Sequence, residues 1–167
     1  VDDVFFHLDD WNGIYHTRVA LTRITQLSQQ LRIHPLLKHY ELFGRTIPKS
    51  PTVSVTANFV GRRKYSTEEI KKAVASGVKE RYGWAYSERF DTSDLNLRLF
   101  LEHERAIIGL RLSPTPLHRR PYKQEHLPGS LKPTAAAAMS VLGEVKAGST
   151  VLDPFCGAGT ILTEAGE

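Results

Sequence analysis

Apolar residues in the first 112 positions follow helical or strand spacing and predict a small α+β unit. An apolar face at helical spacing predicts a helix over residues 14–31, and Ser66 with Glu69 forms a capping box that begins another helix. Strict alternation from Leu95 to Leu101 predicts a strand. The expected elements are a strand at 4–8, a turn at 9–13, helices at 14–31, 34–43 and 66–82, strands at 53–57, 95–101 and 106–112, and a hairpin joining the last two.

The pattern changes after residue 112. The stretch from Ser113 to Thr134 holds five of the nine prolines, which indicates a linker. An Ala-rich helix is expected over 134–145, and the short apolar run Val151–Leu152 predicts a buried strand. That run ends at Asp153, a turn of small residues follows over 156–159, and a helix opens over 160–165.

Composition narrows the function classes. The net charge is +4 and the pI is near 9.3, which is compatible with a nucleic-acid partner without proving one. The single cysteine excludes a disulfide framework and fits a reducing cytoplasm. No apolar run reaches the roughly 18 residues of a membrane span, and the histidines show no metal-ligand spacing, so we expect neither a membrane nor a metal. Val1 in place of Met suggests a segment of a longer chain.

A strand, a glycine turn and a helix in that order form a nucleotide-type cofactor crevice. The carboxylate of Asp153 can accept from an ammonium or a hydroxyl group, and glycine allows backbone to approach a ligand closely. The spacing is Asp-x-x-x-Gly-x-Gly and not Gly-x-Gly-x-x-Gly. A glycine turn alone is a weak signal, so a dinucleotide site or an empty structural turn are the alternatives.

The segment "LDPFCGAGTILTEA" resembles motif I of S-adenosylmethionine-dependent methyltransferases, in the version found in RNA methyltransferases with an N-terminal THUMP domain. The resemblance implies S-adenosylmethionine as cofactor. The residues that it assigns to cofactor binding are Asp153, Pro154, Gly157, Gly159, Thr160 and Thr134. For Thr134, plain helix initiation after Pro133 is an equal alternative.

Three further segments resemble the THUMP methyltransferases: "VSVTANFVGRRKYSTEEI", "DLNLRLFLEHERAIIGLRLS" and "LHRRPYKQEHLPGSLKPTAAAAM". The resemblance implies an α+β THUMP-type domain followed by the first strand-helix unit of an α/β Rossmann-like methyltransferase domain. We assign residues 1–112 to the THUMP-type RNA-binding region, with 1–13 as the candidate end of a preceding ferredoxin-like subdomain. Residues 113–133 are then the basic, Pro-rich linker, and 134–167 begin the methyltransferase domain.

Within this group the chain is most similar to the tRNA guanine-N2-methyltransferases, which implies capture of the tRNA 3′ end by the THUMP domain. A ribosomal-RNA guanine-N2-methyltransferase and a non-catalytic RNA-binding THUMP adaptor are the alternatives. A DNA amino-methyltransferase would share motif I but would not need the THUMP unit. Family members carry a catalytic Asn/Asp-Pro-Pro-Tyr/Phe tetrapeptide that these 167 residues do not contain. We therefore expect the catalytic residues beyond Glu167 and no activity from this segment alone.

Cationic side chains supply the candidate RNA contacts. At the basic turn of residues 62–64, which precedes a helix, an RNA phosphate would find both cationic side chains and free backbone N–H groups. The alternative is that this turn is only solvated and binds no RNA. For the linker cations, salt bridges that hold the linker against the domains are an equal alternative to RNA contact. Arg81 also suits the dipole of the helix that it ends. The candidates are Arg62, Arg63, Lys64, Arg81, Arg119, Arg120 and Lys123.

Overall fold

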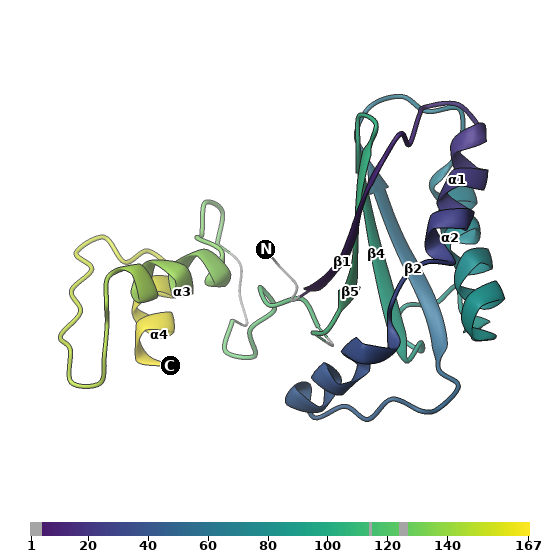
Figure 1. The fold of residues 1–167 in the computed structure, drawn as a ribbon. Coiled ribbons are helices and arrows are strands. Elements are labelled where there is room, and N and C mark those ends of the chain that lie inside the picture. The colour runs from purple at the N-terminus through teal and green to yellow at the C-terminus, as the bar shows by residue number, and fades with distance from the viewer. Residues whose placement is uncertain (1–4, 114, 124–126) are drawn as a thin grey trace. The chain divides into compact units, whose positions relative to one another are not determined.

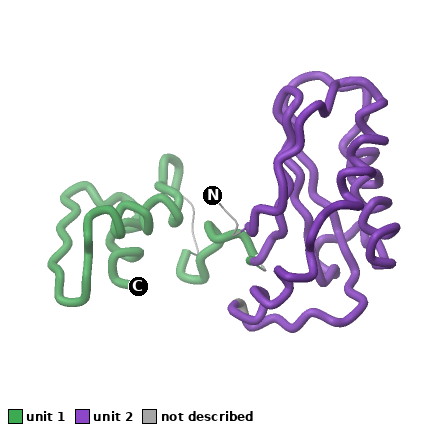
Figure 2. The backbone as a smooth tube through the Cα atoms, viewed as in Figure 1, with its two compact units in different colours: residues 1–4, 113–167 green, residues 5–112 purple. Residues whose placement is uncertain are grey.

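The structure is a computed structural model that describes residues 5–113, 115–123 and 127–167. It divides into two compact units, which are described separately below (Figure 2). The first unit comprises residues 5–112, and the second comprises the described residues from Ser113 to Glu167.

A five-stranded mixed sheet forms the first unit (Figure 1). β4 and β5 are an antiparallel hairpin, β1 pairs antiparallel with β5, and β2 runs parallel to both β4 and β3. The strands, in their order across the sheet, are β1 (Phe5–Asn12), β5 (Arg105–Arg111), β4 (Leu95–Glu102), β2 (Thr52–Phe59) and β3 (Ala85–Tyr86).

Helices α1 (Val19–Ser28) and α2 (Thr67–Tyr82) cover one face of this sheet (Figure 1). Their apolar faces and the inward side chains of the strands form the core, in which Ile24, Val74 and Leu99 are almost fully buried. Gly77 lets the two helices approach closely, because a Cβ at that position would lie 2.4 Å from a backbone oxygen of α1. The first unit therefore has a two-layer α+β core.

Local sequence signals explain where two of the helical segments begin or end. The Ser66 hydroxyl accepts a hydrogen bond from the Glu69 amide at 3.2 Å, and the Glu69 carboxylate accepts from the Ser66 amide at 2.9 Å. This capping box begins α2 at the residue predicted from the sequence. The 3-10 helix η1 (His34–Phe43) ends at Gly44, whose φ of 65° is readily adopted by glycine.

The second unit is built around two helices, α3 (Pro133–Leu142) and α4 (Thr160–Gly166), which pack against each other. Ala136 of α3 and Thr160 of α4 are buried. The segment between the helices contains the glycine turn, and Leu152 and Phe155 in it are 87% and 92% exposed. In the described residues no helix is long and apolar enough to cross a membrane.

Four local expectations are wrong. The first strand extends to Asn12 where a turn was expected at 9–13, because pairing with β5 continues to Arg105 and buries Trp11. Val4, predicted to begin that strand, lies outside the described residues. The helix expected over 14–31 spans only α1, and the helix expected to reach residue 145 ends at Leu142.

The fourth correction concerns the cofactor motif. Val151 and Leu152 form no strand, since neither is paired with another strand among the described residues. The helix that follows the turn is present as α4. The expected strand-helix unit is thus represented here by its turn and helix.

Candidate cofactor turn and nucleic-acid interface

The turn before α4 is organised by a short-range hydrogen bond that its acidic residue accepts. The Asp153 carboxylate accepts from the backbone N–H of Phe155 at 3.1 Å and is half-buried. Asp side chains commonly stabilise turns in this way. The side chain therefore helps to fix the start of the turn that contains the two glycines.

Both glycines of the turn adopt left-handed backbone conformations, with φ of 53° at Gly157 and 68° at Gly159. The Gly159 amide donates to the carbonyl of Cys156 at 2.7 Å and closes the turn. No heavy atom lies within 4 Å of the position that a Cβ on Gly159 would occupy. A side chain at either position would strain the backbone, so this turn requires glycine.

The remaining predicted cofactor residues differ in exposure. Pro154 is exposed, whereas the side chain of Thr160 is buried at the start of α4. Thr134 lies in the first turn of α3 and is half-buried. Five of the six predicted residues thus lie in one continuous segment that runs from Asp153 to the first residue of α4, and Thr134 lies on the neighbouring helix.

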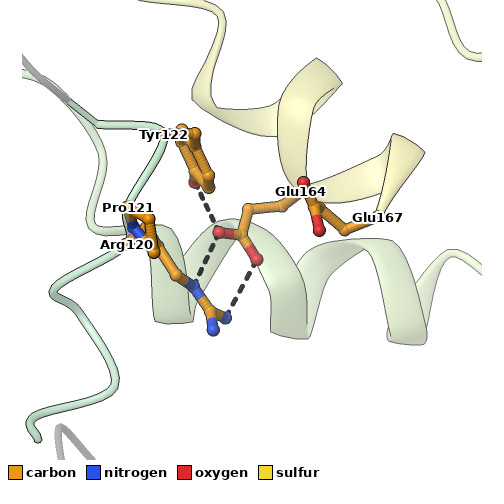
Figure 3. A pocket seen from close by; sticks show the side chains of 5 residues that line it. All are labelled: Arg120, Pro121, Tyr122, Glu164 and Glu167. Atoms are coloured by element: carbon orange, nitrogen blue, oxygen red, sulfur yellow. Dashed lines mark hydrogen bonds and ion pairs between the residues drawn. The ribbon is translucent and has the colours of Figure 1, made fainter.

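A buried carboxylate on α4 is held by two linker residues (Figure 3). Arg120 donates two hydrogen bonds to Glu164, at 2.9 and 3.0 Å, and the Tyr122 hydroxyl donates a third. The Glu164 side chain is only 4% exposed. These side chains, with Pro121 and Glu167, line a cavity of about 350 Å³.

The position of Tyr122 beside Glu164 shifts the pKa of its phenol. Partial burial, and after it the hydrogen bond to the Glu164 carboxylate, together raise the pKa of its phenol from 10.0 to about 12. Both causes disfavour the phenolate, since it would be less hydrated and would lie beside a carboxylate. The hydroxyl therefore remains a donor to Glu164 throughout the neutral pH range.

The three predicted RNA-binding cations of the linker differ in whether their side chains form hydrogen bonds within the protein. Arg120 is engaged with Glu164, and Lys123 donates to the Ser130 hydroxyl at 2.8 Å and to the Leu131 carbonyl at 3.1 Å. This geometry favours the salt-bridge alternative for Arg120 over a free RNA contact. Arg119, by contrast, is exposed. Of the three candidates, Arg119 is the one whose side chain faces solvent.

The basic turn between β2 and α2 shows a similar division. Arg63 donates to the Ile14 carbonyl at 3.2 Å, to the Tyr65 hydroxyl at 2.8 Å and to the His103 carbonyl at 2.6 Å. Arg63 thus joins three loops, and most of its donor capacity is used within the protein. Arg62 and Lys64 are exposed, so they are the residues of this turn that are available to a polyanion.

Arg81 lies apart from that turn. It is exposed in the last turn of α2, whereas the basic turn precedes the first. A helix of 16 residues is about 24 Å long. The structure therefore does not place Arg81 with Arg62 and Lys64 in one cluster.

Three residues at these places were not identified from the sequence. Glu164 follows the buried Thr160 by four residues and so lies on the same face of α4, which is a signal that helical spacing could have given. His16 and His103 lie beside Arg62, and no local pattern indicates this because they come from loops distant in sequence.

Comparison with known proteins assigns both parts of the chain. Residues 39–111 match the family described as the THUMP domain. Residues 120–167 match the family described as the RMKL-like methyltransferase domain. These matches confirm the recognised family and the fold class, and S-adenosylmethionine is the cofactor of such a methyltransferase domain.

Two curated relatives act on different RNAs. A tRNA (guanine(6)-N2)-methyltransferase from Thermus thermophilus is 30% identical over 152 residues, which is 91% of this chain and 43% of the relative. A ribosomal RNA large subunit methyltransferase K/L from Methylococcus capsulatus is 32% identical over 124 residues, which is 68% of this chain and 17% of the relative. The chain therefore spans less than half the length of either relative.

The fold is also found in a solved structure. TrmN from Thermus thermophilus superposes with a TM-score of 0.66 at 24% sequence identity, over 99% of this chain and 45% of that one. At this identity the likeness supports the shared fold.

Proposed function

We propose that this chain, in which a match to the THUMP domain is followed by a match to the RMKL-like methyltransferase domain, belongs to an enzyme that transfers a methyl group from S-adenosylmethionine to guanine N2 of tRNA. The observation that carries the proposal is the presence in one chain of an exposed basic turn in the first domain and an Asp-x-x-x-Gly-x-Gly turn in the second. The relative that matches 91% of the chain is a tRNA guanine-N2-methyltransferase.

The glycine turn supplies the cofactor contacts in this proposal. Gly157 and Gly159 expose backbone that a bound ligand can approach, and Asp153 presents a carboxylate beside them. When bound, S-adenosylmethionine supplies an electrophilic methyl group on a sulfonium. The role of Asp153 and the glycines is to hold it so that the guanine amine can approach in line with the breaking bond.

The first domain supplies RNA binding. Arg62 and Lys64 are exposed cations on the turn that precedes α2, and such cations bind the phosphates of an RNA strand. We propose that this domain captures the single-stranded 3′ end of tRNA. The basic composition of the chain, with a net charge of +4, supports a polyanionic partner.

A ribosomal RNA substrate is the second candidate, because the relative from Methylococcus capsulatus acts on large-subunit ribosomal RNA. Both candidates share the methyl donor and the need for exposed RNA-binding cations. They differ only in the RNA that is methylated. The cytoplasmic location expected from the single cysteine stays a prediction.

The test is methyl transfer by the natural protein that carries these residues. Purified total tRNA and purified ribosomal RNA, each from a strain lacking the enzyme, are incubated with S-adenosylmethionine labelled in the methyl group, then digested to nucleosides. Labelled N2-methylguanosine from tRNA is the expected product. Label in ribosomal RNA alone would establish the second candidate, and RNA binding without transfer would leave a non-catalytic adaptor.

A further inference from the structure

The β1–α1, β2–α2 and β4–β5 connections of the first unit meet at one end of its sheet (Figure 1). Residues of these three connections line a cavity of about 290 Å³. His16, Arg62 and His103 line it, one from each connection. Its volume is several times the roughly 30 Å³ that a water molecule occupies in the liquid. The cavity can therefore hold a group larger than a single water.

The charges around the cavity favour an anion. Arg62 and Arg63 contribute two permanent cations, His16 and His103 contribute two imidazoles, and Glu104 is the single carboxylate in the lining. Each imidazole can donate at least one hydrogen bond in either protonation state. No aromatic ring other than these imidazoles lines the cavity, so its chemistry suits a phosphate group better than a stacked base.

The walls of the cavity are held in place by the protein itself. Arg63, in the β2–α2 connection, donates hydrogen bonds to the carbonyl of Ile14 in the β1–α1 connection and to that of His103 in the β4–β5 connection. It therefore links all three connections. Its Nε atom is buried and has no hydrogen-bond partner among the described residues. Arg63 is thus a fixed positive charge in the wall, and little rearrangement is needed to bind an anion.

Gly61 opens the backbone side of the cavity. Its φ is 88°, and no heavy atom lies within 4 Å of the position that a Cβ would occupy. Backbone N–H groups in turns of this kind often form concave anion sites. The turn can therefore approach a phosphate through its main chain as well as through Arg62.

We propose that this cavity is a phosphate-binding site for one backbone phosphate of the RNA, with Arg62, His16 and His103 as its ligands. The proposal rests on the proposed function, because it takes RNA as the substrate. It adds that one phosphate is bound in a defined pocket, and it assigns a binding role to two histidines from distant loops.

Binding of fluorescently labelled tRNA to the 167-residue chain tests the site, with anisotropy measured over a series of salt concentrations. Arg62→Ala, His16→Gln and His103→Asn each remove one ligand. Asn is chosen at position 103 because it tolerates the left-handed φ of 51° found there. Arg23→Ala and His7→Gln are matched controls, since both residues are exposed and neither lines the cavity.

We expect Arg62→Ala to weaken binding about tenfold and to lower the slope of log K against log salt by about 1, as loss of one phosphate contact should. His16→Gln and His103→Asn should weaken binding while both controls match the wild type. Cavity variants that fold by circular dichroism and bind like the controls would overturn the phosphate site. Absence of tRNA binding by the unmodified chain would instead overturn RNA capture by this segment, which is one part of the proposed function.

Discussion

Arg120 of the linker holds Glu164 of α4 through two hydrogen bonds of 2.9 and 3.0 Å. The carboxylate is 4% exposed and the guanidinium side chain 32%. Planar guanidinium groups bind carboxylates in this two-pronged manner with defined geometry. The linker is therefore joined to the helix that directly follows the glycine turn.

Replacement of Arg120 by Ala should destabilise α4, because it leaves a buried carboxylate without its cation. We expect a loss of about 2–3 kcal/mol, at the low end for a buried pair because the guanidinium is partly exposed. Hydrogen exchange of peptides covering residues 160–166 measures this as the free energy of local opening. The exposed neighbour Arg119→Ala is the matched control and should change little. Equal exchange in the two variants would show that the pair contributes nothing.

Alkaline titration should reveal the hydrogen bond from Tyr122 to Glu164. The pKa of this phenol is raised from 10.0 to about 12. Because the folded-state pKa lies above the unfolded value, the stabilisation is fully present below pH 10 and is lost as the pH rises through about 12. Tyrosinate absorbance near 295 nm should lose one group with a midpoint near pH 12 in Tyr122→Phe. Loss of a group that titrates near pH 10 would contradict the assignment.

The capping box predicts a pH-dependent effect at the start of α2. Ser66→Ala should lower the free energy of unfolding by about 1 kcal/mol at pH 7, whereas Ser66→Thr retains a hydroxyl cap and should lower it less. The Ser66 amide, and secondarily Arg18, hold the pKa of Glu69 below its ordinary value. The contribution of Glu69 is therefore present above pH 4.5 and is lost as the pH falls through its lowered pKa.

Urea denaturation followed by tryptophan fluorescence measures the free energy of unfolding of the first unit, since Trp11 and Trp84 both lie in it. The difference in free energy of unfolding between a Glu69→Ala variant and the wild type should shrink at pH 3, because the carboxylate is then largely protonated. A difference that stays constant with pH would show that Glu69 takes no part in the cap.

Gly77→Ala should be destabilising although alanine is the better helix former. A Cβ at this position would lie 2.4 Å from the Thr25 carbonyl oxygen and 2.6 Å from the Ser28 Cβ. The higher helix propensity of alanine should stabilise α2 by about 1 kcal/mol. The cost of moving the two helices apart should be larger, so we expect the free energy of unfolding to fall by about 1–2 kcal/mol in total. Urea denaturation measures the free energy of unfolding of Gly77→Ala and of a control variant, Ser76→Ala, at the exposed neighbouring position. A more stable Gly77→Ala variant would contradict the close packing.

Sequence patterns predicted the elements whose signals are local. The capping box gave the start of α2. Alternation from Leu95 to Leu101, with a short turn and a second strand expected at 106–112, predicted the β4–β5 hairpin, because both signals depend on residues close together in the chain. The extent of β1 was missed, since Asp9 and Asp10 are unusual strand residues and only pairing with β5 makes them part of the sheet. Strand pairing across about 100 residues leaves no local pattern.

The site residues show the same limit. The glycine turn was predicted from its spacing, and its left-handed conformations depend only on neighbouring residues. For Arg120 the sequence left RNA binding and a salt bridge equally open, because Glu164 is 44 residues away. Arg63 was predicted with its neighbours to contact RNA, whereas in the structure it donates to carbonyls on two other loops and to the nearby Tyr65 hydroxyl.

We expect RNA capture and cofactor binding to belong to separate parts of this chain, which variants of the natural protein can separate. Initial rates of methyl transfer to tRNA are measured for Asp153→Ala and for the double variant Arg62→Ala with Lys64→Ala. We predict that Asp153→Ala abolishes N2-methylguanosine formation with tRNA affinity unchanged, and that the double variant raises the KM for tRNA with kcat retained. Full activity of Asp153→Ala, or an unchanged KM in the double variant, would show that the two functions are not divided in this way.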